Sequence, residues 1–392
     1  MDRSITTKCI HLEEEQNESN HYGAISYPIY QTAAYVHEGA GKSTGYDYSR
    51  LQNPTREHLE KIIASLENGT DALAFSTGMS AIAALMELFK PGDHLIVDTD
   101  LYGGSIRLFR NISQKNGITF TSIACCKEDV ESYITENTRA IYIETPTNPM
   151  MNVTDIAALS KIARKHHLLL VVDNTFLSPY FQNPLSLGAD VVIHSGTKYL
   201  GGHNDTLAGF LVTQREEISE QLRFNIKTTG AGLAPFDSWL MIRGIKTLAI
   251  RMEKAQSNAI QIAQWLQKQE AVRKVIYPGL KTHPGYEVMC RQSRGFGGML
   301  AFEVKSKEFA LSVLEKVKLI QFAESLGGVE TLITYPVTQT HADVPKDVLE
   351  KNGITENILR LSVGIEEVND LIEELKDVFR KTEEDLSHGT KS

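Results

Sequence analysis

Short apolar runs alternate with longer segments whose apolar residues recur at helical spacing, from about residue 53 to residue 213. The runs predict buried strands, and segments between them, such as 79–89 and 153–167, predict helices. This alternation indicates a mainly parallel sheet covered on both faces, in which ligands bind beyond the carboxyl ends of the strands. The predicted strands are 72–75, 94–99, 118–123, 140–145, 168–173, 191–195 and 208–213.

The regions on either side of this pattern differ from it. Segment 55–68 predicts a helix that Thr55 caps and that Asn68-Gly69 ends. The polar, glycine-rich residues before it predict an extended arm. After an amphipathic helix at about 245–268, the pattern indicates a smaller α+β domain. We therefore divide the chain into an arm (1–52), a large domain (53–244) and a small domain (245–392).

Composition narrows the class of protein. Forty Lys and Arg against forty-nine Asp and Glu give a net charge of −9 over 392 residues, of which 42% are hydrophobic. These values are typical of a soluble globular protein, and they argue against a nucleic acid or an anionic membrane as principal partner. The amino end has no apolar signal segment, and four cysteines predict neither a disulfide framework nor a metal site. We expect a cytoplasmic protein.

Two predicted strands end in residues with complementary chemistry. Asp173 ends one strand, and Lys198 follows another, 25 residues later. In one parallel sheet their side chains share a crevice, where a plain salt bridge is the simplest alternative. The hydroxyls of Ser195 and Thr197, with the Gly201-Gly202 pair, suit a phosphate, and the lysine suits a carbonyl. A carboxylate that keeps a pyridinium nitrogen protonated completes the needs of pyridoxal phosphate.

A second phosphate element precedes a strong helix. Ser76, Thr77 and Gly78 lie between the strand 72–75 and the helix 79–89. The backbone amides of Gly78 and Met79 would therefore point at an anion from a helix N-terminus.

With these residues in place, the chain resembles the trans-sulfuration (Cys/Met metabolism) branch of fold-type I pyridoxal-phosphate enzymes, the PLP-dependent transferase-like fold. The matching motifs follow one another in the same order as in the family and span more than 300 residues. These motifs are YSRLQNPTR (48–56), STGM (76–79), DLYGG (100–104), ETPTNP (144–149), VVDNTF (171–176), HSGTKYLGGH (194–203), AESLGGVE (323–330), THADVP (340–345) and LRLSVGIE (359–366).

The resemblance implies a role for each cofactor-facing residue. Lys198 holds pyridoxal 5'-phosphate and moves protons between carbon atoms of the substrate. Asp173 faces the pyridinium nitrogen, and Tyr102 stacks on the ring and acts as acid or base. The implied phosphate ligands are Ser195, Thr197 and the amides of Gly78 and Met79.

Two implied ligands lie in the arm. The resemblance places Tyr48 and Arg50 on the cofactor phosphate of the neighbouring subunit, which implies a homo-oligomer of at least two chains and typically four. The alternative is that both side chains lie on a solvated arm.

The resemblance also implies substrate-binding residues. Arg360 clamps the substrate α-carboxylate, with Asn148 and Ser325 as helpers. Glu324 stands where γ-acting cystathionine enzymes tend to carry a glutamate, which could engage the distal amino group of cystathionine. A solvated charge at the pocket rim is the alternative.

The expected activity is γ-elimination of L-cystathionine to cysteine, 2-oxobutanoate and ammonia, with sulfide production as a side activity. Cystathionine γ-synthase, cystathionine β-lyase and methionine γ-lyase remain alternatives within the family. Outside it, a nicotinamide dehydrogenase would need a GxGxxG turn after a strand, which the sequence lacks. A non-catalytic assembly protein would be expected to lack Lys198 or Asp173.

Overall fold

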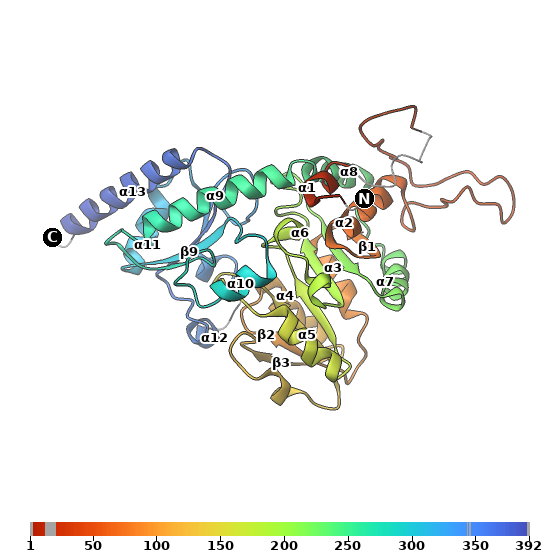
Figure 1. Ribbon diagram of the computed structural model, residues 1–392, viewed down its shortest axis with the longest axis horizontal. Helices are drawn as coiled ribbons and strands as arrows, with labels where there is room; N and C mark the ends of the chain where they lie inside the picture. The colour runs from red at the N-terminus through yellow and green to blue at the C-terminus, as the bar shows by residue number, and fades with distance from the viewer. Residues whose placement is uncertain (1–2, 12–20, 343, 345, 390–392) are drawn as a thin grey trace.

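The computed structural model describes residues 3–11, 21–342, 344 and 346–389. Two β-sheets lie next to each other along the long axis of the molecule, and helix α9 (Leu248–Leu266) runs from one to the other (Figure 1). The larger sheet is built from residues 71–213 and the smaller one from residues 272–362. The chain thus forms a large α/β unit followed by a smaller α+β unit.

The large sheet has seven strands in the order β1-β7-β6-β5-β4-β2-β3. Only β7 runs antiparallel to its neighbours, so the expectation of a mainly parallel sheet is confirmed. All seven predicted strands form, each within two residues of its predicted bounds. They are β1 (Asp71–Phe75), β2 (His94–Asp98), β3 (Thr119–Ile123), β4 (Thr138–Glu144), β5 (Leu169–Asp173), β6 (Val191–Ser195) and β7 (Gly209–Thr213).

Both faces of this sheet are buried, which explains why its strands are continuously apolar. In β5, Leu170 and Val172 contribute to the core beneath α2 and α5, whereas Val171 contributes to the core beneath α3 and α7. The helices of this unit are α1 (Ile5–Lys8), α2 (Pro54–Glu67), α3 (Gly78–Met86), α4 (Gly103–Leu108), α5 (Ile156–Lys165), α6 (Ser178–Phe181), α7 (Glu216–Thr229) and α8 (Pro235–Ile245), with short turns Phe109–Ser113, Val130–Tyr133 and Pro184–Leu187.

The small sheet packs against α9 and the C-terminal helix. Its strand order is β10-β11-β12-β9-β8, and all of its pairings except β10 with β11 are antiparallel. In the described part of the chain no helix combines the length and apolar character needed to cross a bilayer. The elements are β8 (Val272–Ile276), α10 (Tyr286–Gln292), β9 (Met299–Val304), α11 (Lys307–Lys316), β10 (Gln321–Phe322), β11 (Leu332–Thr334), a turn Pro336–Thr338, α12 (Lys346–Lys351), β12 (Ile358–Ser362) and α13 (Val368–Gly389).

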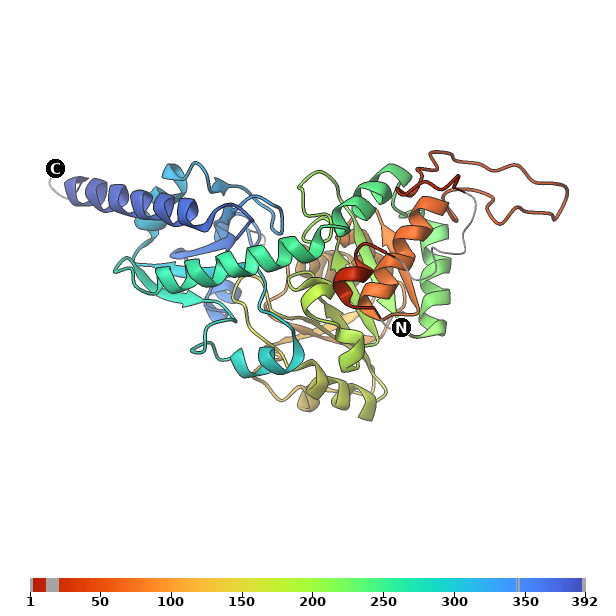
Figure 2. The same cartoon turned by 45° about the horizontal axis from the view of Figure 1, so that its top comes forward.

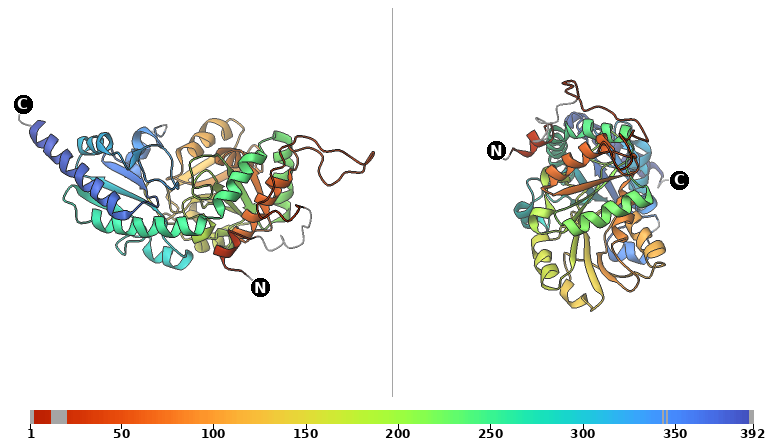
Figure 3. Two further views of the ribbon diagram at one scale, coloured as in Figure 1. Left: turned by 90° about the horizontal axis from the view of Figure 1, so that it is seen from above. Right: turned by 90° about the vertical axis from the view of Figure 1, so that its right-hand side faces the viewer.

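The N-terminal region has two parts. Helix α1 packs on α2 and α9, and Cys9 is buried there. Residues 21–52, here called the extended segment, form a loop that projects from the end of the molecule opposite α13 (Figures 2 and 3). Residues 1–2 and 12–20 of the predicted arm lie outside the described residues. The division at residues 52 and 244 stays a proposal.

Asn53, and not Thr55, caps α2. The Asn53 side chain accepts hydrogen bonds from the backbone amides of Thr55 and Arg56, at 3.0 and 3.4 Å. The prediction that Thr55 is the cap was wrong because Pro54 fits the first helical position, which places the cap two residues earlier, at Asn53. The Thr55 hydroxyl instead donates to the carbonyl of Pro28 at 2.9 Å. Asn68 ends the helix in the left-handed region, as predicted.

Replacing Asn53 should loosen both α2 and the base of the extended segment, because Asn53 Nδ2 also donates to the carbonyl of Tyr30 at 2.9 Å. We expect Asn53→Ala to lower the free energy of unfolding by about 1–2 kcal/mol. Asn53→Asp keeps the capping oxygen and should lose less. Thermal unfolding of the three proteins checks this order, and equal midpoints for Asn53→Ala and the native chain would contradict it.

Candidate active site

The carboxyl ends of β4, β5 and β6 meet at one edge of the large sheet. In the strand register Glu144 pairs with Asp173, and Asp173 pairs with Ile193, two residues before Ser195. One pocket opens at this edge, between the two sheets. Eleven of the thirteen predicted site residues line it: Gly78, Met79, Tyr102, Asn148, Asp173, Ser195, Thr197, Lys198, Glu324, Ser325 and Arg360.

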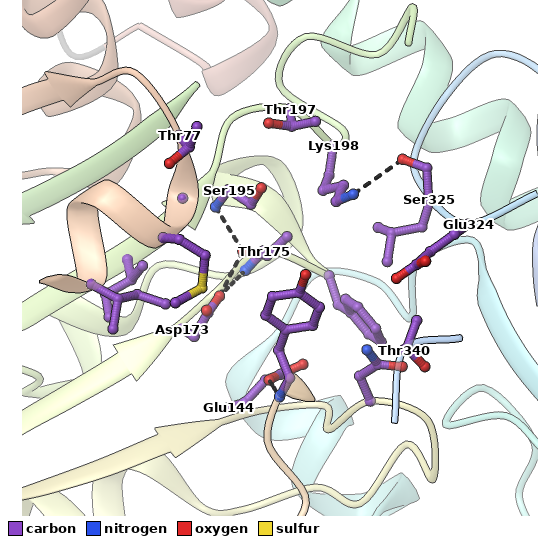
Figure 4. A pocket seen from close by; sticks show the side chains of 18 of the residues that line it. Thr77, Glu144, Asp173, Thr175, Ser195, Thr197, Lys198, Glu324, Ser325 and Thr340 are labelled. Atoms are coloured by element: carbon purple, nitrogen blue, oxygen red, sulfur yellow. Dashed lines mark hydrogen bonds between the residues drawn. The ribbon is translucent and has the colours of Figure 1, made fainter. Parts of the chain in front are cut away.

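Lys198 projects into the pocket from the turn that follows β6. Its Nζ donates to Ser325 Oγ at 3.1 Å, and Glu324 lies on the same side of the pocket (Figure 4). The pKa of Lys198 is lowered from 10.5 to about 8, mainly by burial and secondly by the Arg360 cation, while Glu324 partly opposes the fall. At neutral pH about one such amine in ten is therefore in the neutral form that attacks a carbonyl, against fewer than about one in a thousand for an ordinary lysine.

Asp173 is held by a residue that the sequence analysis did not identify. Thr175 donates to Asp173 Oδ1 from its backbone amide at 3.0 Å and from its hydroxyl at 2.6 Å. Thr175 Oγ1 also accepts from the amide of Ser195 at 2.9 Å, which ties β5 to β6 (Figure 4). Burial raises the pKa of Asp173 and the Thr175 bonds oppose that rise. An Asp followed two residues later by Thr is a local turn pattern that could have identified Thr175.

The opposite corner of the pocket combines backbone amides with hydroxyls. Thr77 caps α3 by accepting from the amide of Ser80 at 2.9 Å, so the free amides of the first turn are exposed at Gly78. A Cβ on Gly78 would lie 3.1 Å from Ser195 Oγ, and one on Gly209 would lie 2.1 Å from the Thr77 carbonyl oxygen. A Cβ at Gly209 would clash with the backbone and one at Gly78 would crowd Ser195, so the two glycines let the helix end lie directly against β6 and β7. Such a corner suits a phosphate.

Arg360 closes the pocket from the small sheet and is only 1% exposed. Its Nη1 donates to Asn148 Oδ1 at 2.8 Å, and its Nη2 donates to the carbonyl of Ser325 at 2.9 Å and to Thr334 Oγ1 at 3.1 Å. Burial lowers the pKa of Arg360 to about 10, so it stays charged at neutral pH. These neighbours are neutral, which leaves a cation suited to a substrate carboxylate.

Glu144, another residue that the sequence analysis did not identify, lies beside Asp173. Its Oε2 accepts from the backbone amide of Tyr102 at 3.0 Å. Burial raises the pKa of Glu144 well above its usual range, and the neighbouring Asp173 carboxylate raises it further. Two carboxyls this close favour a single negative charge between them. Burial and the Glu324 charge also raise the pKa of Tyr102.

Tyr48 and Arg50 do not reach this pocket in their own chain. Both lie on the extended segment, and Tyr48 is 45% exposed. The Arg50 guanidinium lies 5.6 Å from the centroid of the Tyr48 ring and donates to the carbonyl of Lys227. The structure therefore separates these two from the other eleven predicted residues.

The pocket thus offers an amine, a buried carboxylate at one side and an amide-and-hydroxyl corner at the other. That donor set fits a ligand with an aldehyde, a pyridine-type nitrogen and a phosphate. Residues 6–380 match the family model described as Cys/Met metabolism PLP-dependent enzyme. The chain belongs to this family.

Relatives with three different activities are similarly close. The chain is 48% identical to a cystathionine γ-synthase/O-acetylhomoserine (thiol)-lyase of Bacillus subtilis, covering 98% of each chain. It is 49% identical to a B. subtilis cystathionine γ-lyase (90% and 93% covered) and 46% identical to a Lactococcus lactis cystathionine β-lyase (96% and 99%). A solved cystathionine γ-lyase from Lactobacillus plantarum, complexed with L-serine, has a TM-score of 0.93 at 41% identity, covering 97% and 100%.

Membership of the family makes the protein a pyridoxal-phosphate-dependent enzyme of cysteine and methionine metabolism, and small amino-acid substrates fit it. The predicted fold class is confirmed by the same comparisons. When bound, the cofactor supplies an electron sink for carbanionic chemistry. We propose that Lys198 holds it, that Asp173 faces its ring nitrogen, that Tyr102 covers its ring, and that its phosphate occupies the α3 corner.

Cofactor uptake by the cofactor-free enzyme should report the pKa of Lys198. Because only the neutral amine attacks an aldehyde, we expect the uptake rate to rise with pH and level off above about 8, well below the 10.5 of an ordinary lysine. Glu324→Gln should move the midpoint lower, since Glu324 raises this pKa. Stopped-flow absorbance measures the rate, with N-acetyl-lysine as the control for titration of the cofactor itself. A midpoint near 10 would show that Lys198 is not buried as described.

Proposed function

We propose that the protein catalyses γ-elimination of L-cystathionine, giving cysteine, 2-oxobutanoate and ammonia. The observation that carries this proposal is the placement of Glu324 in the pocket that Lys198 and Arg360 line. No described side chain forms a hydrogen bond or ion pair with its carboxylate. L-cystathionine has an amino-acid group at each end. Arg360 can bind the α-carboxylate at the reacting end while Glu324 pairs with the ammonium at the other.

The proposed chemistry divides the proton transfers between two side chains. Lys198 Nζ removes the Cα proton and delivers it to another carbon atom, and the neutral amine that this restores then removes a Cβ proton of the substrate. The Cγ–S bond then breaks, and the Tyr102 hydroxyl supplies a proton to the departing sulfur. Arg360 and Asn148 hold the carboxylate, so that the Cα–H bond stays aligned for cleavage. Addition of water to the remaining four-carbon unit gives 2-oxobutanoate and ammonia.

A second candidate is γ-replacement, in which cysteine adds to the same unsaturated four-carbon unit. The similarity of the chain to the B. subtilis γ-synthase/thiol-lyase supports this second candidate. Incubation with L-cystathionine and identification of the keto acid separates the main alternatives. We expect 2-oxobutanoate, whereas pyruvate would indicate β-elimination and overturn the proposal. Formation of cystathionine from O-acyl-homoserine plus cysteine, at a rate above that of elimination, would favour the synthase.

Glu324→Gln tests substrate choice directly. We expect KM for L-cystathionine to rise about two- to fivefold, because an exposed ion pair to the distal ammonium is lost at the pocket mouth. KM for O-acetyl-homoserine, which has no distal amino group, should change little. Glu330→Gln is the matched control, since Glu330 is an exposed carboxylate on the same loop that pairs with Asn204 at 2.7 Å outside the pocket. Equal KM increases for both substrates would remove Glu324 from substrate recognition.

We also propose that Tyr48 and Arg50 bind the cofactor phosphate of a neighbouring subunit, so that the active enzyme is at least a dimer. Their separation from their own pocket and the projection of the extended segment support this proposal (Figure 2). A guanidinium can bind two phosphate oxygens at once.

Mixed oligomers test this assignment. Arg50→Ala should weaken cofactor retention, and mixing it with Lys198→Ala subunits should restore activity, because one site then combines an intact Lys198 with an intact Arg50. Mixing with the Arg50→Ala/Lys198→Ala double variant should restore nothing. Equal activity in the two mixtures would show that Arg50 acts within its own chain.

A further inference from the structure

A buried carboxylate joins two segments that each carry a pocket residue. Asp100 is 2% exposed and lies two residues before Tyr102. Its Oδ2 accepts from the Thr147 hydroxyl and from Asn152 Nδ2, the latter at 3.2 Å. Both donors belong to the loop 145–152 that follows β4. The turn 100–104 is therefore bonded to this loop through one acidic side chain.

Glu144 makes a second connection between these segments, in which the acceptor lies at the start of the loop and the donor lies in the turn. It is the last residue of β4, directly before the loop, and it accepts from the backbone amide of Tyr102 in the turn at 3.0 Å. Each segment thus contributes one carboxyl group that the other segment satisfies. Two connections in opposite directions restrain sliding of the segments as well as their separation.

The loop itself is tightly closed around Thr147, which is fully buried. The amide of Thr147 donates to the carbonyl of Asn152 at 2.9 Å, and the amide of Asn152 donates to Thr147 Oγ1 at 2.9 Å. Asn148 lies within this closed loop and accepts from Arg360 Nη1 at 2.8 Å. Tyr102 and Arg360 are therefore connected by the short chain step from Tyr102 to Asp100, the hydrogen bond from Thr147 to Asp100, the peptide link from Thr147 to Asn148, and the hydrogen bond from Arg360 to Asn148.

We propose that Asp100 and Glu144 form an acidic clamp that locks the turn 100–104 to the loop 145–152, so that Tyr102 and the Asn148–Arg360 pair are positioned as one unit. The proposal rests on the roles proposed above for Tyr102, Asn148 and Arg360. Asp100 and Thr147 do not line the pocket and act as positioning residues. The clamp sets the distance between the group that covers the cofactor and the groups that hold the substrate carboxylate.

The physical reason is the chemistry of the acceptor. Donors that are buried with one acceptor leave a buried polar group unpaired if they move away from it, so Asp100 holds the Thr147 hydroxyl and the Asn152 side-chain amide, and Glu144 holds the Tyr102 amide. Hydrogen bonds behind the residues that touch a ligand fix their orientation, and small displacements of reacting groups are costly in rate. The Thr147 hydroxyl donates to Asp100 and accepts from the backbone amide of Asn152. Removing this hydroxyl therefore weakens both the clamp and the closure of the loop.

Thr147→Val in the cofactor-loaded enzyme tests the clamp, with glycine as an amino-acid probe that has a carboxylate and no side chain to eliminate. We expect glycine binding, followed by absorbance, to weaken about tenfold. We also expect a changed visible circular dichroism of the cofactor in the absence of glycine, because Tyr102 shifts. Thr147→Ser, which retains the hydroxyl, should recover both values.

Thr154→Val is the matched control. Thr154 is equally buried and seven residues away, and its hydroxyl has no hydrogen-bond partner among the described residues. We expect native glycine affinity and circular dichroism for this variant. Equal behaviour of Thr147→Val and Thr154→Val would overturn the clamp. If Thr147→Val does not fold, Asn152→Ala replaces it, because this variant removes the half-buried side-chain donor to Asp100. We expect Asn152→Ala to weaken glycine binding and change the circular dichroism in the same direction but by less. Native values of both would overturn the clamp.

The clamp and the proposed site roles fail in different ways. Tyr102→Ala and Asn148→Ala remove groups of the pocket itself. If these variants leave circular dichroism and glycine binding unchanged, the assigned roles are wrong. If they alter them while Thr147→Val and Asp100→Asn do not, the roles stand and the clamp is wrong. Asp100→Asn and Thr147→Val both weaken the same hydrogen bond, the one from Thr147 to Asp100. If the clamp acts as proposed, the double variant Asp100→Asn/Thr147→Val therefore binds glycine no more weakly than the weaker-binding single variant.

Discussion

The active-site pocket is organised around one buried cation. Arg360 lies in a strand of the small sheet among apolar residues, and no described carboxylate lies within ion-pair distance of its guanidinium. An unpaired buried charge costs several kcal/mol unless hydrogen bonds satisfy it. Arg360 therefore bonds Asn148 of the large unit and the Ser325 carbonyl, while the Ser325 hydroxyl accepts from Lys198. Satisfying this one charge brings the two units and their functional groups together.

The parallel sheet supplies the other half of the pocket. Because parallel strands end at the same edge, Glu144, Asp173 and Ser195 are brought together by register alone. The α3 N-terminus then reaches this edge because Gly78 and Gly209 leave no Cβ in the way. Backbone geometry therefore places the Asp173 carboxylate and the N-terminus of α3, and only the Lys198 amine and the Arg360 cation reach the pocket on long side chains.

The sequence predicted the large sheet well because each of its strands is buried on both faces and is therefore continuously apolar. The α2 cap was predicted wrongly because Asn53 and Thr55 are both good capping residues, although the proline between them favours the first helical position and therefore Asn53 as the cap. Thr175 and Glu144 were missed for a different reason. Their importance comes from contacts across strands and with the turn at Tyr102, and one isolated Thr or Glu carries no periodic signal. Motif resemblance, and not periodicity, identified Arg360 and Glu324.

Glu324 acts on both parts of the pocket at once. Its charge raises the pKa of Lys198 and that of Tyr102, while the Arg360 cation lowers both. Arg360 alone would leave Lys198 a weaker base, because a neighbouring cation disfavours the protonated amine. A substrate that brings an ammonium to Glu324 and a carboxylate to Arg360 would neutralise both influences together. The two charges proposed to select a substrate with an amino-acid group at each end are thus the same two that shift the pKa values of Lys198 and Tyr102.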